Sequence, residues 1–117
     1  LNKTVAPGQV LPYSHSAEER APYKASCSVH PWMTSWILPR NNGYFAKTDA
    51  QGNFTIADLP TGVELTFKVW QEKVGAFQDV TVNGQSMKWP KTGFKQTLQP
   101  EQTLTLDVEV DAAPFTK

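Results

Sequence analysis

Proline and glycine occur at short intervals along this chain, and their spacing limits the length of its helices and strands more than any other feature. The 117 residues include nine prolines and seven glycines. Proline disrupts helix interiors and central strands, whereas glycine is favoured at turns. Long helices therefore have little room, and short strands joined by turns are the expected elements. No apolar run approaches the length that crosses a bilayer, so we expect no membrane span.

Between these interruptions, several segments alternate apolar and polar residues with period two, as half-buried strands do. The clearest are ELTFKVWQE at 64–72 and TLTLDVEV at 103–110. TSWIL at 34–38 is also a predicted strand, and it ends before a proline. The side chains expected to point inward are Phe54, Ile56, Leu59, Leu65, Phe67, Val69, Leu104, Leu106 and Val108.

Turn sequences separate the predicted strands. DAQG at 49–52 lies between two aromatic runs, and Asn-Gly at 83–84 ends the segment FQDVTVNG. Both contain a glycine that can adopt positive φ. Nearer the N-terminus, we expect strands around Val10 and in APYKASC at 21–27. SHSAEER at 14–20 lies between them and could form one short helical turn. Short strands at regular spacing predict an all-β chain folded as an antiparallel Greek-key β-sandwich.

Charge and known motifs argue against several classes of function. Lysine plus arginine and aspartate plus glutamate each total 11, so the formal net charge is zero. Proteins that bind nucleic acid or anionic membranes usually show a basic excess, so we expect neither partner. The chain also lacks the G-x-S-x-G elbow and the helical motif of zinc hydrolases. We therefore expect no enzymatic activity.

The segment CSVHPWM, residues 27–33, holds the single cysteine together with a histidine and a methionine. One cysteine cannot form an internal disulfide or a four-cysteine metal site. Copper accepts a thiolate, two imidazoles and a weak axial thioether. Cys27, His30 and Met33 supply three of these donors in a loop between two predicted strands. The proline and tryptophan of the loop are expected to stiffen it and to exclude water from the metal.

Two other interpretations of these residues stay open. Cys27 and Met33 are also suitable core side chains, and His30 is a suitable hydrogen-bonding turn residue. A copper site further needs a second imidazole, and the remaining histidine is His15. The site is completed by His15, completed by a residue before Leu1, or never filled.

The chain resembles the C-terminal part of a bacterial plastocyanin-like family whose members are termed methylamine utilization proteins. The resemblance rests on NKTVAPGQ, CSVHPWM, NNGYFAKTDAQGNFTIADLPTG and FKVWQEK. It implies a cupredoxin-like segment at 1–35 followed by a carboxypeptidase-regulatory-like β-sandwich at 36–117. It also implies copper ligation by Cys27, His30 and Met33, and a periplasmic or extracellular location.

The chain departs from this family at two histidine positions. The family's first copper histidine lies before the segment matched by LNKTVAPG, so we expect a processed or truncated N-terminus. Where relatives often have V-W-H-E, this chain has glutamine at position 71.

Two functions therefore stay open. One is an electron-transfer module with a redox partner. The other is a metal-free structural or interaction β-sandwich, a subunit of a larger assembly. Either way, we expect the strands of the first 35 residues to bind a neighbouring subunit, another copy or a missing N-terminal segment.

Overall fold

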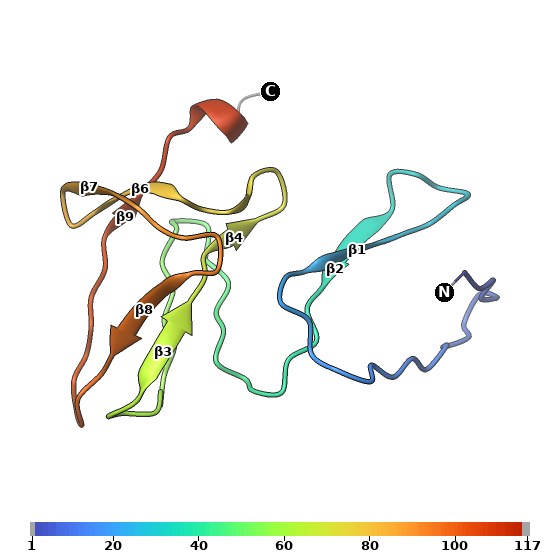
Figure 1. Cartoon of the computed structure of the whole chain (residues 1–117). Coiled ribbons are helices and arrows are strands. Elements are labelled where there is room, and N and C mark those ends of the chain that lie inside the picture. The colour runs from blue at the N-terminus through green and yellow to red at the C-terminus, as the bar shows by residue number, and fades with distance from the viewer. Residues whose placement is uncertain (1, 116–117) are drawn as a thin grey trace. The chain divides into compact units, whose positions relative to one another are not determined.

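The computed structural model describes residues 2–115, and it consists of short strands, turns and extended segments (Figure 1). Within this range the one helical element is a single 3-10 turn, η1, at Ala113–Phe115. The chain is therefore all-β, as predicted. It divides into two compact units, Leu1–Gly43 (unit 1) and Tyr44–Lys117 (unit 2).

Unit 1 contains one two-stranded sheet, formed by β1 (Tyr23–Ser26) and β2 (Thr34–Ile37). The strands are antiparallel, with Tyr23 opposite Ile37 and Ser26 opposite Thr34. Both strands lie where the sequence predicted them. The predicted domain boundary between residues 35 and 36 stays a prediction, although β2 runs across it.

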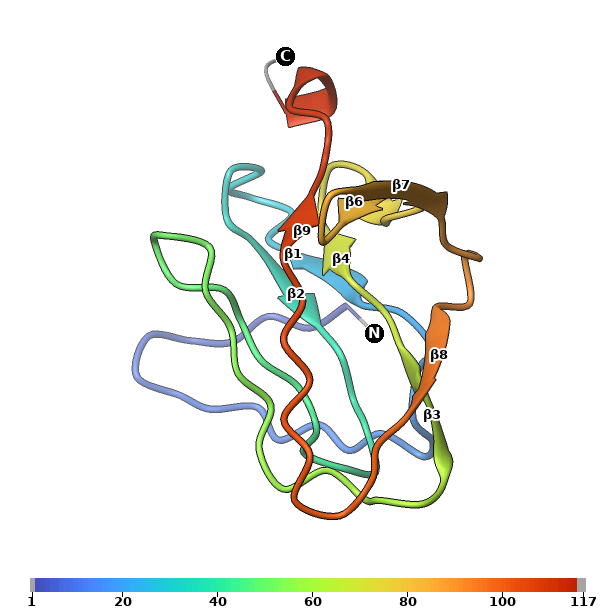
Figure 2. The same cartoon turned by 90° about the vertical axis from the view of Figure 1, so that its left-hand side faces the viewer.

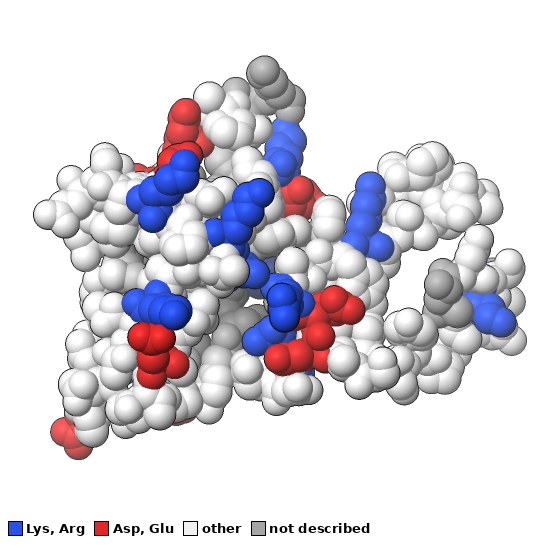
Figure 3. Space-filling model, viewed as in Figure 1, with Lys and Arg blue, Asp and Glu red and all other residues white. Residues whose placement is uncertain are grey.

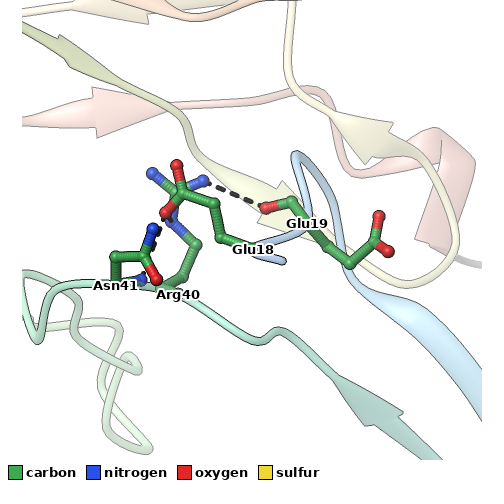
Figure 4. Close-up of polar contacts among 4 residues, drawn as sticks. All are labelled: Glu18, Glu19, Arg40 and Asn41. Atoms are coloured by element: carbon green, nitrogen blue, oxygen red, sulfur yellow. Dashed lines mark hydrogen bonds and ion pairs between the residues drawn. The ribbon is translucent and has the colours of Figure 1, made fainter. Parts of the chain in front are cut away.

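Residues 16, 17 and 20 form bends, with no helical turn within 14–20 and no strand around Val10, so the predicted helical turn and first strand are wrong. Contacts with the segment after β2 account for the irregular course of these residues (Figure 4). Glu18 Oε2 lies 3.6 Å from Arg40 Nε and accepts a hydrogen bond of 3.1 Å from Asn41 N. Arg40 Nη1 donates to the Glu19 carbonyl at 3.0 Å. Glu19 N also donates to the Pro39 carbonyl at 2.9 Å, so both backbone groups of Glu19 bond outside the segment and not within a helical turn.

Unit 2 contains three small antiparallel sheets (Figures 1 and 2). The first pairs β3 (Glu64–Phe67) with β8 (Phe94–Thr97), and the second pairs β4 (Trp70–Gln71) with β5 (Gly75–Ala76). The third has the order β7-β6-β9, with bounds Gln85–Lys88, Asp79–Val82 and Val108–Glu109.

Three strand predictions for unit 2 need correction. The single strand expected at 64–72 is divided into β3 and β4 because each pairs with a different partner. Only two residues of the segment 103–110 form a strand. The runs that flank the turn at 49–52 carry no assigned strand. Alternation of apolar and polar residues indicates where the backbone is extended. It does not show whether a neighbouring strand is present to form the hydrogen-bonded ladder.

Both predicted turns are confirmed. Asn83 has a φ of 50° and Gly84 a φ of 83°, as a type I′ hairpin requires, and they connect β6 to β7. In the other turn, Gly52 has a φ of 85° and donates its N–H to the Asp49 carbonyl at 3.0 Å. Asp49 and Asn53 close that turn, because Asp49 N donates to the Asn53 carbonyl at 2.9 Å.

The core of unit 2 forms around Val80, Val82 and Trp89, which are at most 8% exposed. The half-buried hydrophobic residues packed against them are Val69, Phe77, Phe94, Leu106 and Val108. Three of these were predicted to point inward. Phe54 and Leu104 were predicted to do so as well, but they are 46% and 38% exposed. The four sheets remain small and unclosed, so the Greek-key sandwich stays a prediction.

Charged side chains of both signs are intermixed on the surface shown in Figure 3. Within unit 2, Lys88 lies 3.8 Å from Asp79 and Lys95 lies 3.5 Å from Glu64. This mixture agrees with the zero net charge. In the part of the chain that the structure describes, no helix has the length and apolar character needed to cross a membrane.

Candidate metal centre

The segment CSVHPWM forms the loop that connects β1 to β2. Cys27 N donates to the Met33 carbonyl at 3.0 Å, which extends the strand pairing by one position beyond Ser26 and Thr34. Inside the loop, Met33 N donates to the His30 carbonyl at 2.9 Å. Two hydrogen bonds thus fix the backbone that carries all three predicted donors.

Cys27 and His30 contact each other through the cysteine sulfur. Sγ lies 3.9 Å from His30 Nδ1, and the backbone N–H of His30 points to the same sulfur at 3.4 Å. A metal bound at ~2.3 Å from sulfur and ~2.0 Å from nitrogen would make an S–metal–N angle of about 130° at this separation. That angle is close to the value for trigonal coordination, so both atoms can ligate one ion without a large movement.

Met33 lies directly across the hairpin from Cys27. Alternation along β1 places Tyr23, Ala25 and Cys27 on its more buried face, and Met33 continues the opposing register. Opposed residues of an antiparallel pair have Cβ atoms about 4.5–5.5 Å apart. The Met33 side chain therefore leaves the hairpin on the same face as that of Cys27.

His15 lies beside tyrosines. A hydrogen bond joins its Nε2 to the Tyr23 hydroxyl, and its ring meets the Tyr13 ring edge-on, with centroids 4.9 Å apart. Tyr23 precedes Cys27 by four residues along β1, a distance of ~13 Å in an extended strand. The structure therefore brings Cys27, His30 and Met33 together in one loop, and His15 lies near the other end of β1.

The loop is open to solvent. The His30 and Trp32 rings lie with centroids 5.2 Å apart and tilted by 38°, yet the Trp32 side chain is 77% exposed. Val29 is 76% exposed. Trp32 therefore covers one side of the His30 ring, but it does not make the loop dry. The expected exclusion of water is not achieved because the loop projects beyond its two-stranded sheet.

Residues 2–115 contain no group of three or more histidine, cysteine, aspartate and glutamate side chains placed to hold a metal. The third candidate donor beside Cys27 and His30 is the weaker thioether of Met33. The tyrosine partners of His15 were not predicted from the sequence. Tyr13, at i–2, was the available indication, whereas Tyr23 joins the cluster through the fold.

The chain has no significant match among models of protein families, curated proteins or solved structures.

Proposed function

We propose that the loop at residues 27–33 holds a mononuclear copper ion, and that the chain is an electron-transfer module of cupredoxin type. One observation carries the proposal: the 3.9 Å separation of Cys27 Sγ and His30 Nδ1 in a loop whose strand pairing sets Met33 opposite the cysteine. Thiolate, imidazole and thioether are a donor set that suits copper, whereas thioether ligation tells against zinc.

Each residue of the loop has a separate role in this proposal. Cys27 would supply its sulfur as the thiolate, the form that binds metals. The His30 N–H that points to this sulfur stabilises its negative charge. The His30 ring would supply nitrogen, and Met33 would supply the weaker thioether sulfur. Copper, when bound, adds the ability to gain and lose one electron.

The donors also favour one oxidation state of copper. The cysteine thiolate is a soft ligand, and the three donors of the loop suffice for Cu(I). Stable Cu(II) binding of this type needs a second imidazole, and His15 is bonded to Tyr23 near the other end of β1. We propose that this imidazole comes from a neighbouring subunit.

The resemblance to bacterial plastocyanin-like proteins supports the remaining parts of the proposal. These parts are a Greek-key sandwich, a division into a cupredoxin-like segment at 1–35 and a regulatory-like sandwich at 36–117, and a periplasmic or extracellular location. The partner of such a module is a redox protein.

A metal-free structural or interaction subunit is the second candidate function. Residues 2–43 include no fully buried side chain. Many of their large apolar side chains are exposed, namely Val5, Val10, Leu11, Tyr13, Val29, Trp32, Met33, Trp36, Ile37 and Leu38. Exposed apolar side chains that form a contiguous patch mark a protein interface, which supports this candidate. A neighbouring subunit on unit 1 is compatible with either function.

Anaerobic titration of the full chain with Cu(I), against a competing chelator, tests the proposal. We expect one tightly bound ion in the native protein and loss of tight binding in Cys27→Ser. Met87→Leu is the matched control, because Met87 lies on β7 in unit 2. Equal affinities of the native protein and Cys27→Ser would reject the copper site and leave the structural function.

A further inference from the structure

We propose that Asn42 is a site of spontaneous deamidation in the folded protein, and that the second Asn-Gly sequence, at Asn83, is protected by its hairpin. The chain contains Asn-Gly at 42–43 and at 83–84. Both sites can undergo the same reaction, so their deamidation rates can be compared within one protein. The main difference between them is backbone conformation.

The reaction is a ring closure between neighbouring residues. The backbone nitrogen of the glycine attacks Cγ of the asparagine, a new N–C bond forms, and the Cγ–Nδ2 bond breaks. The leaving amide takes the glycine proton and departs as ammonia. Water then opens the succinimide at either carbonyl, giving aspartate or isoaspartate.

This ring closure requires the glycine nitrogen to lie on the same side of the asparagine Cα–C bond as Cβ. Asn83 has a φ of 50°, which places it in the left-handed region. In that region ψ is about +30° to +60°. For an L-residue, such a ψ turns the next nitrogen nearly to the opposite side from Cβ. Asn83 must therefore leave its turn conformation before it can react.

Three contacts oppose that change at Asn83. The hairpin pairs Val82 with Gln85 on either side of the turn. Asn83 N donates to the Asp107 carbonyl at 2.8 Å, and Asp107 N donates to Asn83 Oδ1 at 2.8 Å. Both the backbone and the side-chain amide of Asn83 are thus fixed. Succinimide formation requires local opening of the β6–β7 hairpin and its contact with the segment before β9.

Asn42 lies in a different setting. It is exposed and belongs to the segment 38–63, in which no strand is assigned. The described non-glycine residues with positive φ are Asp58, Asn83 and Glu101, so Asn42 lies outside the left-handed region. A Cβ built on Gly43 would meet nothing within 4 Å, so the space beside the glycine that supplies the attacking nitrogen is open. Rotation about the Asn42 backbone breaks no strand ladder.

The site also has a structural consequence. Glu18 contacts Arg40 and Asn41, the two residues that precede Asn42 in the chain (Figure 4). Gly43 is the last residue of unit 1. Deamidation therefore adds a negative charge at the end of unit 1, and isoaspartate lengthens the backbone there by one methylene group.

Peptide mapping by mass spectrometry after incubation of the folded chain at mildly alkaline pH tests the proposal. Trypsin separates the two sites, because Asn42 lies in the peptide 41–47 and Asn83 in the peptide 74–88. Fragmentation distinguishes Asn42 from Asn41. We expect Asn42 to react about tenfold faster than Asn83, the factor that ~1.4 kcal/mol of hairpin opening gives. In concentrated urea the two rates should become similar.

Gly43→Ala provides the matched variant. It should fold normally, because the position has open space and no left-handed φ. The added methyl group hinders attack, so deamidation of Asn42 should slow while that of Asn83 is unchanged. Equal rates at the two sites of the folded protein, a faster reaction at Asn83, or no reaction at Asn42 would each overturn the proposal.

Discussion

Phe67 on β3 and Phe94 on β8 are directly opposed, and their rings stack with centroids 5.5 Å apart. Phe94 also stacks on buried Trp89, with centroids 4.3 Å apart. The three rings form a column that connects the β3–β8 sheet to the core of unit 2. The column supplies side-chain packing that two short strands lack when isolated.

The column gives the first prediction, for Phe67→Ala. Because Phe67 is half-buried, we expect a loss of about 2–3 kcal/mol in the free energy of unfolding, less than the ~3–5 kcal/mol for a fully buried phenylalanine. Phe54→Ala is the control. Its side chain is 46% exposed, so its removal should cost less than ~1 kcal/mol. Urea denaturation measures both values. Similar losses in the two variants would argue against the ring column.

The second prediction concerns Gly93, which has a φ of 109°. A Cβ at this position would lie 2.3 Å from the Phe67 carbonyl oxygen, which is backbone and cannot rotate away. Gly93→Ala should therefore cost more than ~3 kcal/mol, through both clash and backbone strain. Gly62→Ala separates these causes. Gly62 has a φ of 72° and open space around it, so it should lose only ~1–2 kcal/mol. Thermal unfolding of both variants provides the comparison.

The third prediction concerns the missing imidazole. We expect the loop to bind Cu(II) only when a second imidazole is present. Adding free imidazole to the protein mixed with Cu(II) should therefore produce the visible thiolate-to-copper charge-transfer band. Cys27→Ser should abolish this band, whereas His15→Ala should leave it unchanged because His15 lies by Tyr23. A strong band without added imidazole, lost in His15→Ala, would show that His15 completes the site.

The fourth prediction concerns Met33. Because a weak axial thioether stabilises the oxidised ion, Met33→Leu should keep copper bound and raise its reduction potential. The measurement is a redox titration of the imidazole-supplemented protein, with Met87→Leu as the control. An unchanged potential would place the Met33 sulfur outside the coordination sphere.

The fifth prediction concerns the pH dependence of the turn at residues 49–53. The pKa of Asp49 is lowered, chiefly by the hydrogen bond from the Asn53 backbone N–H to Oδ1, 2.8 Å long, and further by the one from Gln51 N. A carboxyl group whose pKa is lower when folded stabilises the protein above its unfolded pKa of about 3.9, and this contribution disappears as the pH falls through the folded pKa.

Asp49→Asn should therefore be less stable than the native protein near neutral pH, and the difference should shrink as the solution becomes acidic. Thermal unfolding across the pH range measures the difference. Asp58→Asn serves as the control, because Asp58 is a bend residue whose φ of 57° asparagine also tolerates. If the stability difference between the native protein and Asp49→Asn stays constant with pH, the turn does not depend on the carboxylate charge.

The sequence was sufficient to predict those features of the fold that depend on neighbouring residues. Asn83–Gly84 predicts its own turn because glycine and asparagine tolerate the left-handed backbone that a type I′ hairpin needs. Cys27, His30 and Met33 are brought into one loop because the strands around them are short and adjacent in the chain. The β-rich class follows for the same reason, since period two and frequent prolines are local properties.

Tertiary structure alone decided which strands pair and which faces are covered. β8 contains few apolar residues, and it forms a strand because Gly93 lets its backbone approach Phe67. Trp89 is buried although no periodic run contains it, whereas Phe54 and Leu104 fit their pattern and remain exposed. His15 takes Tyr23 as its partner instead of the cysteine loop. Alternation fixes two faces for each strand, but the partner that covers a face comes from a distant part of the chain, where local pattern carries no information.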